Sequence, residues 1–133
     1  MSHTVLNVDT IATDADLIAE VASKARLDRA MPDVAQRDAI RAQALQDVVD
    51  ALATRSPPVR DTQLADPTEL KQSVVYRSLA KIFLSAIAVD GDVHSMLNRA
   101  YEREYQAAVR RSFTLSPDGA AGSSGFTFRM ERR

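Results

Sequence analysis

The residues that could carry out chemistry in this chain are few and lie far apart. Ser78 and Lys81 have the S-x-x-K spacing, in which a lysine one helical turn from a serine helps to activate the serine hydroxyl for acyl transfer. The companion motifs S-D-N and K-T-G are missing from the sequence. We therefore interpret the pair as an ordinary serine and lysine on a helix.

A second candidate is the acidic pair Asp90 and Asp92, because clustered carboxylates are the ligands that calcium prefers. An EF-hand loop counted from Asp90 needs a glutamate at its twelfth position. That position is Tyr101, and Glu102 comes one residue too late. We predict a turn between two helices instead, with Asp92 as the N-cap of the second helix.

The remaining candidates are two histidines and a glycine-rich stretch. His3 and His94 lack the i,i+4 spacing of a metal pair and have no obvious partner for a catalytic triad. The stretch GAAGSSG, residues 119–125, is not followed by the lysine of a phosphate-binding loop, so we interpret it as a linker. We expect no metal, no cofactor and no catalytic centre, and hence a protein that is not an enzyme.

The composition is that of an ordinary globular protein. With a net charge of -1, the chain has no overall attraction to nucleic acid or to an anionic membrane. It has no cysteine, which excludes disulfides and thiolate zinc sites. The N-terminus does not resemble a signal peptide, and no segment is apolar over about 18 residues. We expect a protein that acts in a cytosol-like compartment and does not bind membranes.

The positions that could do chemistry must be held by helices, because the apolar residues recur at helical spacing. A first helix is predicted from Thr13, in a capping-box arrangement with Asp16, to Met31. A second is predicted from about Asp33 to Thr54. Its polar face is expected to be solvated and consists of Gln36, Arg37, Arg41, Gln43 and Asp47.

The strongest local signal is Asp66-Pro67-Thr68-Glu69, which combines an N-cap aspartate, an N1 proline and a glutamate at N3. It predicts a long apolar helix over residues 67–89. After the turn at residues 90–92, a further helix is predicted over residues 93–113. A short turn between two long helices predicts an antiparallel hairpin.

These patterns predict an all-α fold with a four-helix body, a long antiparallel helical hairpin and an extended C-terminal arm. We expect an N-terminal extended segment (residues 1–12), a helical domain (13–113) and a flexible C-terminal arm (114–133) with a short strand. Phe126, Phe128 and Met130 alternate with polar residues, as in a strand. Such a strand would pair with a sheet in another protein; the alternative is a terminal segment without regular structure.

Residues 69–115 resemble the helical hairpin of head-tail adaptor (connector) proteins of tailed bacteriophages. The first helix has the form LK-x-x-VVY-x-x-L-x-x-IF, which begins at Leu70 and ends at Phe83. After a short turn, the second has the form YE-x-E-Y-x-x-A, which begins at Tyr101 and ends at Ala108. The likeness covers about a third of the chain, and the rest matches only in outline.

The resemblance implies a structural protein of the virion neck, made in the host cytoplasm. Adaptors of this kind form a ring, usually dodecameric, beneath the portal protein, extend the DNA channel without sequence-specific binding, and dock the next neck or tail protein. Their C-terminal arms reach into the portal. The corresponding residues here are Phe126, Thr127, Phe128, Arg129 and Met130.

Basic residues near the end of the chain are candidates for the channel wall or for an interface with an acidic partner: Arg110, Arg111, Arg132 and Arg133. Arg110 and Arg111 equally fit a solvated helix C-terminus, where the helix dipole favours cations. Arg99 and Glu102 are spaced for an i,i+3 ion pair on the same helix. The alternative function is a small helical regulatory or nucleic-acid-associated binding module that uses these arginines.

Overall fold

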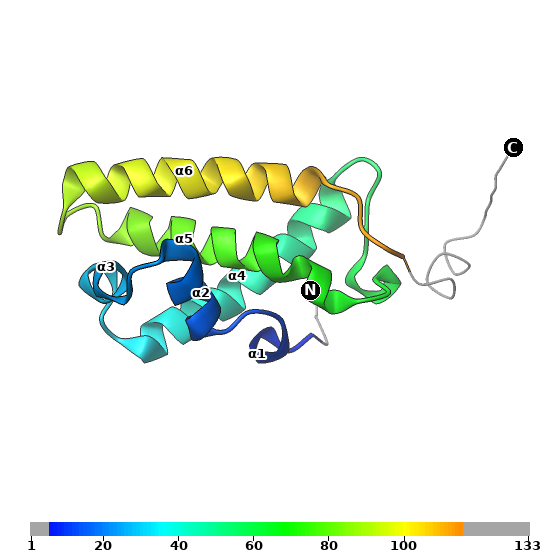
Figure 1. Cartoon of the computed structure of the whole chain (residues 1–133). Coiled ribbons are helices and arrows are strands. Elements are labelled where there is room, and N and C mark those ends of the chain that lie inside the picture. Colours follow the sequence, from blue (N-terminus) through cyan, green and yellow to red (C-terminus); the bar gives the residue numbers. More distant parts are fainter. Residues whose placement is uncertain (1–5, 116–133) are drawn as a thin grey trace, which may run out of the picture.

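The computed structural model describes residues 6–115, which form an all-α fold, as the sequence predicted (Figure 1). Within this range the only β-type pairing is one antiparallel bridge between Leu64 and Leu115. The α-helices are α1 (Val8–Ile11), α2 (Asp14–Val21), α3 (Lys24–Ala30), α4 (Val34–Thr54), α5 (Lys71–Ser85) and α6 (Gly91–Arg110). Two 3-10 helices, η1 (Asp61–Gln63) and η2 (Pro67–Leu70), lie in the connection between α4 and α5.

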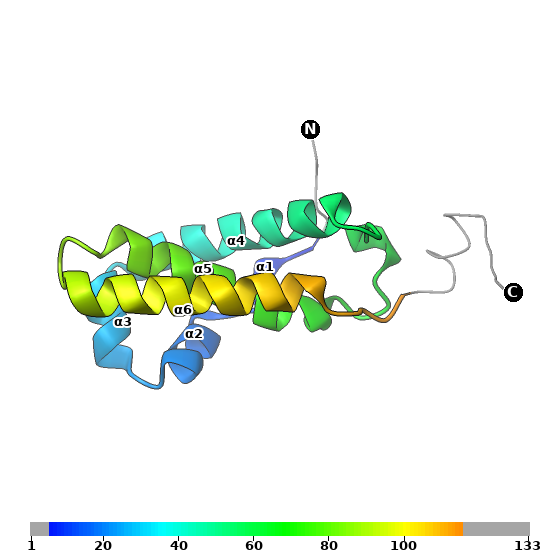
Figure 2. The ribbon, with the colours of Figure 1, turned by 90° about the horizontal axis from the view of Figure 1, so that it is seen from above.

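Helix α5 lies at the centre of the molecule. Helix α6 runs beside it in the opposite direction, α4 packs on another side, and the short helices α2 and α3 lie on the side away from α4 (Figures 1 and 2). The apolar residues of α5 are accordingly buried around much of its circumference; Val74, Leu79, Ile82 and Phe83 have no exposed surface. An apolar band this wide needs cover on more than one side.

The first predicted helix is interrupted, and this prediction was wrong. Ala22 ends α2 in the left-handed conformation, with φ at 59°. Ser23 then caps α3, because its hydroxyl accepts a hydrogen bond of 3.1 Å from the backbone N–H of Arg26. The local cap therefore outweighs the apolar periodicity that runs through both helices.

The predicted extended N-terminal segment is also corrected where the structure describes it. Residues 8–11 form α1, which is capped by the side chain of Asn7 through a 3.0 Å bond from the N–H of Asp9. Ile11 is buried, so this short helix contributes to the core. The capping box of Thr13 and Asp16 at the start of α2 is confirmed.

The polar face of α4 is not solvated as predicted, because Arg37 and Arg41 are buried, with 1% and 4% of their surfaces exposed. Arg37 donates two hydrogen bonds of 2.8 and 3.0 Å to Asp14 and one of 2.9 Å to Asp28. Arg41 donates to the carboxylate of Asp9, 3.0 Å away. The two arginines therefore tie α1, α2 and α3 to α4.

The two long C-terminal helices are shorter than predicted at some of their ends. The Asp66 cap is confirmed, but the first turn after it is the 3-10 helix η2. Helix α5 ends at Ser85, four residues before the predicted Val89, and α6 ends at Arg110. At the end of α6, Arg55 donates to the carbonyl oxygens of Val109 (2.8 Å) and Arg111 (2.6 Å), and so occupies carbonyl groups at the helix terminus.

Candidate interaction surface

Aromatic rings fill the seam between α5 and α6. Tyr101 of α6 stacks on Tyr76 and Phe83 of α5, with ring centroids 6.1 and 6.0 Å apart. These three residues belong to the sequence motifs that resemble the adaptor hairpin. Such spacings are typical of stabilising aromatic pairs. The motif residues therefore position one helix against the other.

His94 is a structural residue at the turn between α5 and α6. Its ring is completely buried, and Nδ1 lies 2.8 Å from the carbonyl oxygen of Ala86. Its Nε2 atom lies 3.5 Å from a guanidinium nitrogen of Arg26, and its ring lies 5.4 Å from that of Phe83. The sequence showed no partner for this histidine because its partners come from α3 and α5.

The acidic turn forms ion pairs. Asp90 lies 2.9 Å from Arg26 and 3.7 Å from Arg29, and the hydrogen bond from Arg26 holds the pKa of Asp90 below its usual value. Helix α6 begins at Gly91, so Asp92 lies inside its first turn and is not the N-cap that the sequence predicted. Among the described residues, no group of three or more histidine, cysteine, aspartate or glutamate side chains could hold a metal ion.

Ser78 and Lys81 have separate roles in the structure. The Ser78 hydroxyl is buried and donates a 2.7 Å hydrogen bond to the carbonyl oxygen of Val74. Lys81 lies 3.0 Å from the carboxylate of Asp47. This ion pair joins α5 to α4, in agreement with the interpretation of the pair as ordinary helix residues.

Arg77 connects the three long helices. It donates hydrogen bonds of 3.0 Å to Asp47 on α4 and 2.8 Å to Glu102 on α6. Burial opposes ionisation of Asp47, but the hydrogen bonds from Lys81 and Arg77 outweigh it and lower its pKa. The expected pair between Arg99 and Glu102 is therefore not formed, since Glu102 is bound to Arg77.

The two basic residues predicted at the end of α6 differ in their surroundings. Arg111 donates a 3.0 Å hydrogen bond to the carbonyl oxygen of Glu69, and its guanidinium lies 4.9 Å from the ring centroid of Phe113. Arg111 thus joins the end of α6 to η2. Arg110 is exposed and has no hydrogen bond or ion pair within residues 6–115.

The outward side of α6 carries an arginine stripe, which we define as Arg99, Arg103 and Arg110. The first and last are eleven residues apart, about three helical turns, so all three lie on one side of the helix. All are exposed, and none pairs with a carboxylate in the described part of the chain; Arg99 donates only to the Ser95 hydroxyl, 3.2 Å away. Of these three arginines, only Arg110 was predicted from the sequence as an interface candidate.

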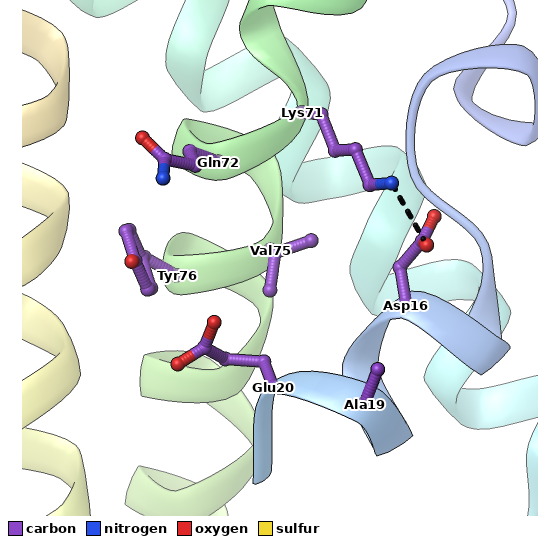
Figure 3. Close-up of a pocket in the computed structure, with 7 residues that line it drawn as sticks. All are labelled: Asp16, Ala19, Glu20, Lys71, Gln72, Val75 and Tyr76. Carbon is purple, nitrogen blue, oxygen red and sulfur yellow. Dashed lines mark ion pairs between the residues drawn. The ribbon is translucent and has the colours of Figure 1, made fainter. Parts of the chain in front are cut away.

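A hollow of about 230 Å³ lies between α2 and α5 (Figure 3). It is lined by Asp16, Ala19, Glu20, Lys71, Gln72, Val75 and Tyr76. Lys71 and Asp16 form a 3.1 Å ion pair at one end. At the other end, Glu20 points toward Tyr76, with Val75 between the two helices. Sequence periodicity did not predict this hollow, because it depends on how α2 packs across α5.

Tyr76 connects the hollow to α6, because its ring stacks on that of Tyr101 and Glu104 follows Tyr101 by one helical turn on the same side of α6. Burial raises the pKa of Tyr76 and Tyr101, and the nearby carboxylates of Glu20 and Glu104 raise both values further. Neither glutamate forms an ion pair or a hydrogen bond within residues 6–115. We call Glu20, Glu104, Tyr76 and Tyr101 the acidic tyrosine groove.

The arm residues 126–130, together with Arg132 and Arg133, lie outside the described residues. No helix in the described part of the chain is long and apolar enough to span a membrane.

Comparison of the chain with protein-family models, curated proteins and solved structures finds no match. The site is therefore defined by its own geometry. This geometry consists of one surface with arginines that lack carboxylate partners and one groove with carboxylates that lack cationic partners. The two surfaces carry charges of opposite sign.

Proposed function

We propose that this chain is a structural head-tail adaptor of a tailed bacteriophage. In this role it forms a ring beneath the portal protein, extends the DNA channel and docks the next neck or tail protein. The carrying observation is the resemblance of residues 69–115, whose motif residues Tyr76, Phe83 and Tyr101 form the stacked seam between α5 and α6. The proposed role is structural, without catalysis or a cofactor.

The arrangement of α6 supports the proposal. The helix packs through one side, where Tyr105 and Val109 are buried, and leaves the opposite side exposed. Subunits of a ring need two different surfaces that are complementary to each other. The exposed side of a long peripheral helix is available for such a contact.

The proposal assigns portal binding to the C-terminal arm, residues 114–133. Phe126, Phe128 and Met130 are proposed to add as a strand to a sheet of the portal protein, where alternate side chains give specificity. Deleting residues 119–133 should abolish stable addition to portal-bearing capsids, measured by co-sedimentation, while circular dichroism remains unchanged. A matched control replaces Thr127 and Arg129 by alanine and should retain attachment better than F126A/F128A. Full attachment of the deleted protein contradicts the anchoring role.

The arginine stripe favours a second candidate, a small nucleic-acid-associated binding module. Such a protein would bind free duplex DNA with an affinity that falls steeply as salt is raised. An adaptor is expected to bind free DNA weakly and to assemble on its portal. DNA titration of the full chain at two salt concentrations distinguishes the two functions.

A further inference from the structure

The described surface carries two sets of charges that find no partner within the molecule. The first is the arginine stripe of α6, and the second is the pair of carboxylates in the acidic tyrosine groove. Elsewhere most charged side chains near a helix contact are paired, as Arg77 is with Asp47 and Glu102. The two unpaired sets have opposite signs.

The groove has the features of a binding site for a cationic side chain. Glu20 supplies a carboxylate at one end, while Lys71 at the other end is already paired with Asp16 (Figure 3). Val75 and the ring of Tyr76 provide an apolar wall for an aliphatic stem. A guanidinium can lie over a tyrosine ring while its donors reach a carboxylate.

The arginines of the stripe cannot fill this groove in their own molecule. Arg103 precedes Glu104 directly, and neighbouring residues on a helix do not face each other. The stripe lies on the side of α6 that is turned away from the buried Tyr105, whereas Tyr101 and Tyr76 lie within the seam. The two surfaces can therefore meet only between copies of the chain.

We propose that a second copy of this chain docks its arginine stripe in the acidic tyrosine groove, with Arg103 between Glu20 and Glu104 and over the ring of Tyr76. The contact joins two different surfaces, so repeating it by rotation builds a ring. The inference supplies the subunit contact of the proposed adaptor, and it rests on that proposed function only for closure of the ring. The contact between the arginine stripe and the groove does not depend on the adaptor role, because it requires only that two copies of the chain associate.

The test is a charge swap on the full chain, followed by sedimentation velocity at low salt. One variant reverses the groove (E20K/E104K) and the other reverses the stripe (R99E/R103E). Each variant alone should self-associate at least about tenfold more weakly than the unchanged protein. Mixing the two should restore association, because each charge then meets its opposite.

Controls separate this contact from folding and from general charge effects. D50K reverses the charge of one exposed carboxylate on α4, as each of the two substitutions in E20K/E104K does, and should associate like the unchanged protein. Circular dichroism of each variant reports whether it is folded, and the mixture is informative even if one variant is less stable. The proposal is overturned if the unchanged protein is monomeric, if the reversed variants associate normally, or if the mixture does not recover.

The experiments distinguish failure of this contact from failure of the proposed adaptor role. Normal self-association with no attachment to portal-bearing capsids contradicts the adaptor role and leaves the contact standing. Attachment of R99E/R103E as complete rings contradicts the contact and leaves the adaptor role standing. A monomeric protein whose DNA affinity falls in R99E/R103E assigns the stripe to nucleic acid and overturns the contact.

Discussion

Helices α1–α3 and helix α6 lie on two sides of α5, and different interactions attach them to the rest of the molecule. Helices α1–α3 bury Ile11, Leu17 and Leu27 in the core. They are also joined to α4 by ion pairs between the buried side chains of Arg37 and Arg41 and aspartates of α1, α2 and α3. Helix α6 is connected through stacked rings and aliphatic side chains. Buried ion pairs contribute little net stability but are costly to break, whereas apolar burial supplies most of the stability. The attachment of α1–α3 thus depends on buried ion pairs in addition to apolar burial, whereas that of α6 depends mainly on apolar and aromatic contacts.

The largest effect is expected in the α5–α6 seam. Phe83 is fully buried between both helices, so F83A should lower the free energy of unfolding by about 4 kcal/mol, from lost burial and the cavity left behind. Urea denaturation measures this loss. The control L84A, at a neighbouring side chain that is 58% exposed, should change the stability by less than about 0.5 kcal/mol. Equal effects of the two substitutions would contradict the claim that burial in the seam stabilises the fold.

The next largest effect is expected at Arg37. R37M leaves Asp14 and Asp28 without their buried partner and should cost about 3 kcal/mol. Unlike F83A, it should act locally, so amide hydrogen exchange should accelerate in α2 and α3 more than in α5. R60M, at an exposed arginine outside the proposed contact between copies, is the matched control. Uniform acceleration along the whole chain would show that the two regions are not held separately.

A smaller effect is expected at the cap of α2. T13A removes the hydroxyl that accepts from the N–H of Asp16, and the expected loss is about 1 kcal/mol. T13S keeps the hydroxyl and should restore most of the stability. Thermal unfolding of the two variants side by side is the measurement, and equal losses in both would contradict the role of the cap.

The smallest effects on stability are those of single titrating groups. Their dependence on pH should have opposite directions in the two regions. Burial opposes ionisation of Asp16, but bonds from Thr13 and Lys71 outweigh it and lower its pKa, and bonds from Lys24 and Arg37 lower the pKa of Asp28. Their stabilising contribution is present above the ordinary value of 3.8 and is lost as the pH falls through the lower folded value.

The tyrosines of the seam have the opposite sign. Burial raises the pKa of Tyr101 and Tyr105, so their contribution is present below the ordinary value of 10.0 and is lost as the pH rises through the higher folded value. Amide exchange should therefore accelerate first in α2 and α3 in acid and first in α6 in alkali. Simultaneous loss of both regions at each extreme would contradict this assignment.

The difference between local and long-range contacts explains which features could be predicted from the sequence. The second helix, the Asp66 cap and the Thr13 capping box were predictable, because apolar periodicity and caps act over a few neighbouring residues. The break at Ala22 and the burial of Arg37 were not, because Arg37 is buried only when Asp14 and Asp28 come together in space. An arginine side chain on a helix is ordinarily exposed to solvent.

Of the candidate surface, the sequence indicated Arg110 but neither the remainder of the stripe nor the groove. Arg99 is spaced for a local ion pair with Glu102, and only the bond between Glu102 and Arg77 in the structure shows otherwise. Glu20 and Tyr76 lie on separate helices, and no spacing rule joins them. Contacts between elements distant in the sequence define this site, so local patterns cannot predict it.

Electron microscopy of the virion neck tests the proposed adaptor role most directly. The purified chain and the assembled particle would be imaged, and the density beneath the portal compared with helices α4, α5 and α6. The account predicts a ring of copies of this chain at the portal, with α5 and α6 paired in each subunit. A neck that lacks this chain, or a chain bound elsewhere as a single copy, would contradict it.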